Sequence, residues 1–368
     1  MSAITSTSQP VRWDAETGAF RVSAFAPAAT VLRGEGWSSD IRLSPLISEE
    51  VRDLPPGSLL FSDPPEHTRL RRLIAPAFTP KAIELLRSRV VAIVDAVLDG
   101  LPEIGPEIDI LADIGYPVTL AVIAELLDVG VEGAELFADQ TPSLVRMLEL
   151  DAGPDDMMAS AVASTELTLF LTPILARRRG NPGNDFISAL LAIPELSLQE
   201  VLSTCVVLLA AGHETTANFI ANSTLALLNQ PDQLPLLLAN PERAVEELLR
   251  LHGAAKLAGR TALTDHQLGG QRIASGQAVL VDIYQANRDP LRFPDPLRMD
   301  LSRELSGHLA FGIGPHFCLG AALARLEASE ILTRMFVRYP HLARIDVPVR
   351  WRRSTGFHAL EELPVRLM

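Results

Sequence analysis

Apolar residues recur at helical spacing through most of this chain. Intervals of three and four residues between apolar positions dominate from Lys81 to Ser329, which predicts a succession of α-helices. The longest runs from about Leu198 to Leu228, between two prolines that cannot continue it. Short alternating stretches at Arg272–Ile273 and Ala278–Val281 are typical of strands. The pattern therefore predicts a mainly α protein with small β-sheets.

The sequence offers no clear domain boundary. With 368 residues and 48% hydrophobic content the chain can bury a large core, and its length alone allows about two domains. No repeat, composition shift or low-complexity linker divides it. Clusters of Pro and Gly, such as the one at Gly180–Asn184, are typical of turns between helices. From the residues alone, the number of domains stays open.

Charge and apolar content narrow the range of partners. The formal net charge of −13 argues against nucleic acid, because phosphate binding requires a cationic surface. Residues Met1–Asp14 are polar and lack the features of a secretory signal, and about ten of them are expected to be flexible. The most apolar window, Val201–Ala211, is far shorter than the roughly 20 residues of a membrane span. We expect a cytoplasmic protein with no membrane or nucleic-acid partner, in which Cys205 is a small buried hydrophobe.

The most informative segment is Phe311–Gly320, a glycine-rich turn that opens into an apolar helix. Gly312, Gly314 and Gly320 permit positive φ, so the backbone can press against a planar ligand. Cys318 lies near the helix N-terminus, where we expect the helix dipole and free N–H groups to lower the thiol pKa. The alternative is a small buried cysteine in a tight turn. The full string favours a thiolate presented to a flat metal macrocycle.

A second motif interrupts the long helix. Gly212 weakens a helix and Thr215 can bond back to the preceding turn, so the two can open a local bulge beside Glu214. The alternative is a back-bonded threonine in a core helix, with Glu214 at its exposed edge. A zinc-protease reading of His213 with Glu214 fails, because Ala217 stands where the second histidine is required.

Two further motifs pair side chains across one helical turn. Glu247 and Arg250 share a face at i and i+3, as do His67 and Arg71 at i and i+4. The alternative interpretation of both motifs is a solvated charged pair on the protein surface. A cationic pair such as His67 with Arg71 is otherwise repulsive unless an anion lies against it.

The string at 311–320 resembles the cysteine-ligand loop of the cytochrome P450 family, Phe-Gly-x-Gly-x-His-x-Cys-x-Gly, at every fixed position. The other motifs follow in the order found in that family, and the resemblance extends from about residue 10 to the C-terminus. It implies a single domain over residues 1–368 with the cytochrome P450 fold. In that fold the haem lies between the long central helix and the cysteine-ligand loop.

The resemblance implies haem b as cofactor, with Cys318 as its axial thiolate ligand. Phe311 would pack beside the sulfur, and His316 would approach a haem propionate. Propionate contacts would also come from the helix that contains His67 and from Arg260. The further implied haem contacts are His67, Arg71, Ala211, Gly212, Arg260 and Gly320.

The family also implies roles for the two charged motifs. Glu214 and Thr215 would relay protons to dioxygen at the iron. Glu247, Arg250 and Arg298 would form a buried ionic network behind the cysteine loop.

The implied substrate pocket draws on three segments and is covered by helices between Ala134 and Ala176. Lys256 is unusual there, because it either pairs with an anionic substrate group or extends to solvent. The implied pocket residues are Leu59, Leu60, Phe61, Ala210, Ala254, Ala255, Lys256 and Leu257.

The resemblance implies a monooxygenase that uses O2 and electrons from a redox partner to hydroxylate a small organic, secondary-metabolite-like substrate. Arg69, Arg72 and Arg325 would border the docking face for an acidic ferredoxin or flavodoxin-type donor. Two alternatives stay open: oxidative coupling, desaturation or peroxide-driven oxidation on the same scaffold, and a non-catalytic haem or ligand-binding protein.

Overall fold

The computed structural model describes residues 9–47, 59–146, 149, 152–304 and 307–367. The first eight residues, which make up most of the segment predicted to be flexible, lie outside the described residues. The long helix α10 spans Leu198–Asn229, which confirms its predicted start and extends its end by one residue. The Ser197 hydroxyl accepts the Glu200 N–H at 3.3 Å and the Glu200 carboxylate accepts the Ser197 N–H at 2.7 Å, a capping box that fixes this start.

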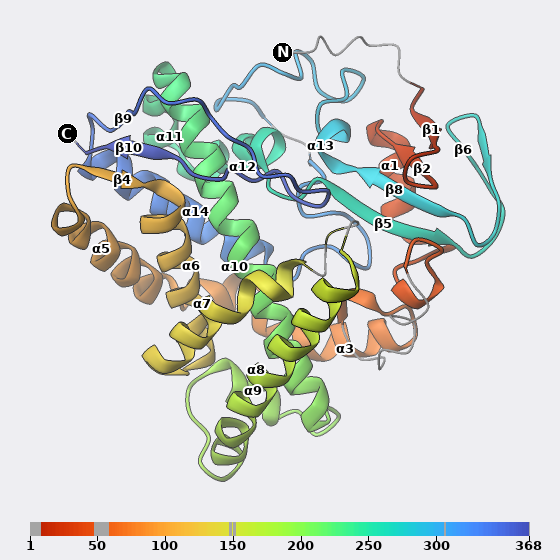
Figure 1. Cartoon of the computed structure of the whole chain (residues 1–368), viewed down its shortest axis with the longest axis horizontal. Coiled ribbons are helices and arrows are strands. Elements are labelled where there is room, and N and C mark those ends of the chain that lie inside the picture. The colour runs from red at the N-terminus through yellow and green to blue at the C-terminus, as the bar shows by residue number, and fades with distance from the viewer. Residues whose placement is uncertain (1–8, 48–58, 147–148, 150–151, 305–306, 368) are drawn as a thin grey trace.

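Helix α10 crosses the middle of the molecule (Figure 1), and α6, α7, α8, α9, α12 and α14 contact it. The segment before α6 crosses α10 closely, since a Cβ on Gly115 would meet Ala217 at 3.3 Å. The helices are α1 (Phe25–Leu32), α3 (Glu66–Ile74), α4 (Pro80–Glu84), α5 (Arg87–Ile104), α6 (Tyr116–Leu127), α7 (Gly130–Arg146), α8 (Pro154–Gly180), α9 (Phe186–Leu191), α11 (Leu234–Ala239), α12 (Pro241–His252), α13 (Ile283–Ala286) and α14 (Ala321–Arg338).

Three small sheets complete the fold, and the strands predicted at 272–273 and 278–281 are confirmed as parts of β7 and β8. The largest sheet has the order β1-β2-β8-β5-β3, with β2 and β8 parallel and the other neighbours antiparallel. The second has the order β4-β10-β9, and β6 and β7 form a hairpin. The strands are β1 (Val11–Asp14), β2 (Ala19–Val22), β3 (Trp37–Ser38), β4 (Glu107–Asp109), β5 (Leu257–Ala262), β6 (His266–Leu268), β7 (Gln271–Ile273), β8 (Ala278–Asp282), β9 (Ala343–Arg344) and β10 (Pro364–Arg366).

The helical pattern predicted as far as Ser329 is wrong between α13 and α14. No helix or strand forms among the described residues of 287–320. Prolines remove backbone donors and glycines favour turns, which together break the periodic signal. These residues are Pro290, Pro294, Pro296, Gly307, Gly312, Gly314, Pro315 and Gly320.

The cysteine loop lies between two hydrophobic cores. Leu309 and Ile313 pack with the cluster built on the largest sheet. Phe311 and Leu319 pack against the larger helical cluster, whose members extend from Leu70 to Val365. The loop is therefore held from both sides.

Two helical stretches have the length and composition of membrane spans, Ile110–Leu127 and Pro154–Gly180. Both include helices that pack against α10. Core helices of soluble proteins share these properties, so the two stretches are weak evidence for a membrane.

Candidate active site

Two glycines shape the cysteine loop. Gly312 and Gly314 have φ of 67° and 81°, and a Cβ on Gly314 would meet the Leu32 carbonyl oxygen at 2.7 Å. The Cys318 N–H donates to the Phe311 carbonyl oxygen at 2.8 Å, which closes the turn. Gly320 is the N-cap of α14 with φ −81°, so the expectation of positive φ is wrong at that position.

Cys318 is exposed, although the surrounding protein desolvates its thiol and so raises its pKa. A hydrogen bond from the Gly320 N–H and the charges of Arg71 and Arg325 oppose this rise. The expectation of a lowered thiol pKa is therefore wrong for the protein alone, although a coordinating metal deprotonates a thiol outright.

Basic side chains converge beside this loop. The rings of His67 and His316 lie 4.0 Å apart, and Arg71 donates to the Phe317 carbonyl oxygen at 2.6 Å. Neither ring nitrogen of His67 nor the Arg260 Nε has a hydrogen-bond partner among the described residues. Buried donors without acceptors are costly, so the cluster is suited to an anionic ligand.

Burial also shifts the pKa values of side chains in this cluster. Burial lowers the pKa of Arg260 to about 10, and burial together with neighbouring cations lowers the pKa of His316 to about 3. Asp63 is the acid that opposes the shifts of His67 and Arg260, and its carboxylate also accepts the Ser39 N–H at 2.8 Å and a short bond from the Ser38 hydroxyl. The propionates of haem b would supply acceptors for the unpaired donors of His67 and Arg260, so these residues fit that cofactor.

Helix α10 presents an open patch in its middle. Ala211 is exposed and Thr215 is partly exposed, although the neighbouring Glu214 is buried. The Thr215 hydroxyl donates to the Ala211 carbonyl oxygen at 2.7 Å. The predicted bulge is absent, because α10 is continuous here and a Cβ on Gly212 would contact Ile123 at 3.2 Å.

Glu214 is buried, and its interpretation as an exposed helix edge is therefore wrong. Its carboxylate accepts a short charged hydrogen bond from Arg352 and a second bond from the Asn218 amide at 2.9 Å. Burial and the Glu214 charge raise the pKa of Tyr116, which faces this pair. Sequence reasoning did not find Arg352, because 138 positions separate it from Glu214.

The ionic network behind the loop forms with one change of partner. Arg250 donates twice to the Glu247 carboxylate at 2.7 Å, and both side chains are fully buried. The third member is Arg303, whose Nε lies 3.1 Å from Glu247. The assignment of Arg298 is wrong: its side chain is exposed, and its carbonyl oxygen accepts from Arg303 at 3.2 Å. Asn287 extends the network, since it accepts from Arg250 and from the Leu309 N–H.

The expected pocket residues fall into different environments. Residues 59–61 form one turn of 3₁₀ helix with Leu60 exposed, and Ala210, Ala255 and Leu257 are partly exposed. Ala254 is 4% exposed, so it packs in the core and its assignment to an open pocket is wrong. The Lys256 ammonium donates to the Ser354 carbonyl oxygen at 2.7 Å, which makes it a structural contact in this conformation.

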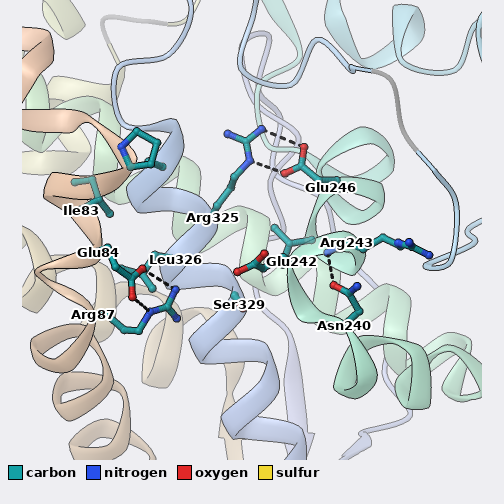
Figure 2. A pocket seen from close by; sticks show the side chains of 13 residues that line it. Ile83, Glu84, Arg87, Asn240, Glu242, Arg243, Glu246, Arg325, Leu326 and Ser329 are labelled. Atoms are coloured by element: carbon teal, nitrogen blue, oxygen red, sulfur yellow. Dashed lines mark hydrogen bonds and ion pairs between the residues drawn. The ribbon is translucent and has the colours of Figure 1, made fainter.

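A groove of about 580 Å³ lies elsewhere, between α4, α5, α12 and α14 (Figure 2). Its charged side chains are largely paired: Arg325 with Glu246 at 3.1 Å, and Arg87 with Glu84 at 2.6 Å. Except for Arg325, which we expected at the docking face, it contains none of the predicted site residues.

Comparison with known proteins agrees with this geometry. The sequence model of the family described as Cytochrome P450 matches residues 232–348. The chain is 41% identical over 318 residues to Cytochrome P450 107B1 of Saccharopolyspora erythraea, covering 84% of this chain and 76% of that protein. It is 38% identical over 358 residues to cytochrome P450 monooxygenase PikC of Streptomyces venezuelae, covering 94% and 84%.

A solved structure, P450BioI in complex with hexadec-9Z-enoic acid ligated acyl carrier protein, superposes with a TM-score of 0.89 at 32% identity. The match covers 95% of this chain and 92% of that chain. The predicted fold is thus confirmed over nearly the whole length. The chain belongs to the cytochrome P450 family of haem-thiolate monooxygenases, whose cofactor is haem b.

Proposed function

We propose that Cys318 holds the haem iron, with the macrocycle in the space between its loop and the open patch of α10. The observation that carries this proposal is the cluster of His67, Arg71 and Arg260 beside the loop, in which neither ring nitrogen of His67 nor the Arg260 Nε has a hydrogen-bond partner among the described residues. When bound, a thiolate-ligated haem supplies reductive activation of O2 and oxidation of a substrate C–H bond. Phe311, Ala211, Gly212 and Gly320 would line the same space.

Proton delivery falls to Thr215 and Glu214. The Thr215 hydroxyl uses its proton for the Ala211 carbonyl oxygen, which leaves its oxygen free to accept from a water or a bound ligand. Glu214 is held by Arg352 and Asn218, so it must exchange one of these partners before it can pass a proton into this space. Arg352 therefore acts as a positioning residue.

The substrate is an apolar organic molecule of the secondary-metabolite type, and its oxidation is a hydroxylation. Leu59, Phe61, Ala210, Ala255 and Leu257 offer apolar contacts without a fixed charge, and the Lys256 ammonium is already engaged. Such a site excludes water and orients the substrate largely by shape.

The direct test is turnover of the haem-loaded protein with a surrogate ferredoxin system under ¹⁸O2. Hydroxylation predicts one labelled oxygen atom in the product of a substrate that shifts the haem spin state. A product without label, formed with consumption of O2, would contradict the proposal.

The electron donor is an acidic ferredoxin or flavodoxin-type protein that docks on the cysteine side. Arg69 pairs with Glu66 and Glu200, and Arg325 pairs with Glu246, so these arginines contribute little net charge. Arg72 is exposed and carries most of this role. Arg72→Glu should slow reduction by the donor at low salt, where electrostatic steering is strongest. An unchanged rate would remove Arg72 from the docking face.

We place the protein in the cytoplasm as a single domain. The cysteine loop supports one domain, because it packs on both the helical cluster that extends from Leu70 to Val365 and the cluster built on the largest sheet.

A further inference from the structure

Helix α8 has a second apolar face that nothing in the described chain covers. Its inward face is buried through Ala163, Leu167, Leu171 and Leu175. The outward positions recur at alternating intervals of three and four residues and are all exposed, with Met158 and Leu169 at 68% and Val162 at 51%. This outward row, the α8 seam, consists of Asp155, Met158, Val162, Thr165, Leu169, Thr172, Ala176 and Arg179.

The spacing of the α8 seam is that of a helix that pairs with another helix. Positions separated alternately by three and four residues form one continuous stripe, as in coiled coils. Figure 1 shows α8 on the outside of the helical layer, toward the viewer, where a second molecule can reach it. One face of α8 therefore packs into the protein core, and the opposite face is accessible to a second molecule.

The threonines of the seam do not oppose burial. The Thr165 hydroxyl donates to the Ala161 carbonyl oxygen at 2.8 Å, and the Thr172 hydroxyl donates to the Thr168 carbonyl oxygen at 2.6 Å. Since both donors are satisfied within the helix, burying these side chains would leave no hydroxyl proton unpaired.

The order of residues along the seam identifies the occupant. We propose that α8 packs antiparallel against α8 of a second copy of this chain, about a two-fold axis level with Leu167. The layers then pair Met158 with Ala176, Val162 with Thr172, and Thr165 with Leu169. Each layer joins a larger side chain to a smaller one.

Charge complementarity supports the same orientation. Asp155 ends the seam on one side and Arg179 on the other, and both are exposed. Antiparallel pairing brings Asp155 of each copy into the layer of Arg179 of the other, whereas parallel pairing would stack like charges. The two-fold arrangement also closes, so it gives a dimer and not a filament. A lipid surface would not require this symmetry.

The test is the mass in solution of the haem-loaded protein, measured by light scattering or sedimentation as concentration rises. The wild-type mass should increase from 39.9 kDa toward twice that value. Leu169→Glu should remain monomeric, because it buries two carboxylates at the centre of the seam. The matched control is Leu291→Glu, at a site 95% exposed in the irregular segment after α13, which should dimerise like the wild type.

Charge exchange gives a second, independent readout. Asp155→Arg should weaken the dimer, and adding Arg179→Asp should restore it. A wild-type protein that is monomeric throughout, or a dimer unaffected by Leu169→Glu, would overturn the proposal. So would a monomer that sediments with phosphatidylcholine–phosphatidylglycerol vesicles through Leu169, since the α8 seam would then face a membrane. The inference does not rest on the proposed function.

Discussion

At the scale of single residues, the site combines a sulfur, a hydroxyl and a carboxylate in different surroundings. Cys318 is exposed on a loop, while Thr215 and Glu214 come from α10. Among the described residues the Thr215 hydroxyl bonds to its own helix, whereas Glu214 pairs with Arg352. Proton delivery should therefore depend on the Thr215 hydroxyl and on the contact between Glu214 and Arg352.

Replacing Thr215 with alanine should reduce product formed per electron consumed while the haem content stays normal. The substitution removes a hydroxyl oxygen from the open patch and leaves helix α10 intact. Product and electron consumption measured together provide the test, with Thr215→Ser as the control that keeps the hydroxyl. Full coupling in Thr215→Ala would exclude this residue from proton delivery.

Arg352→Gln tests the positioning role. The substitution removes one of the two hydrogen-bond donors that hold the buried Glu214 carboxylate, so product formed per electron consumed should fall while the haem content stays normal. Arg353, exposed and adjacent, gives the matched control Arg353→Gln. Coupling equal to that of the wild type would show that Arg352 does not position Glu214.

At the scale of elements, α12 and the irregular chain after α13 are joined by one buried network. Glu247 pairs with both Arg250 and Arg303. Asn287 accepts hydrogen bonds from Arg250 and from the Leu309 N–H, just before the cysteine loop. The loop has no regular structure of its own, so its shape depends on these contacts.

Glu247→Ala should yield protein with little bound haem. It leaves the Arg250 charge buried without its carboxylate partner, at a cost of about 3–5 kcal/mol. Arg303→Ala should lower haem content in the same direction and Arg298→Ala should not, which the ratio of haem to protein absorbance measures. Equal effects of Arg298→Ala and Arg303→Ala would contradict the network described here.

The bounds of the long helix were predicted from sequence, whereas the ionic network was predicted only in part. The bounds of α10 were predicted from its flanking prolines, and the structure adds a capping box at its start. Arg298 was assigned from a family resemblance, whereas the path of a non-repetitive chain brings Arg303, five positions later, to Glu247. Arg352, Asn287 and the core position of Ala254 are likewise set by tertiary contacts that no local pattern encodes.

At the scale of the whole molecule, buried neutral histidines couple folding to pH. Burial lowers the pKa of His252 to about 3 and those of His213 and His358 to about 4, against 6.5 for an unperturbed side chain. Below pH 6.5 the unfolded chain binds protons that the folded chain refuses. The free energy of unfolding should therefore fall as pH decreases from about 6.5 toward 4.

His252→Gln should flatten this dependence by up to about 1.4 kcal/mol per pH unit. Chemical unfolding at about pH 7 and about pH 5 measures the slope. The control is His341→Gln, which changes an exposed histidine and should leave the slope unaltered. A slope that is the same in all three proteins would rule out His252 as a contributor.

The whole account depends on a bond between the sulfur of Cys318 and haem iron. The absorption spectrum of the reduced protein under carbon monoxide reports this bond most directly. We predict the red-shifted Soret band of a thiolate complex in the wild type and its loss in Cys318→Ser. A wild-type protein that binds no haem, or a Cys318→Ser protein with an unchanged spectrum, would contradict the account.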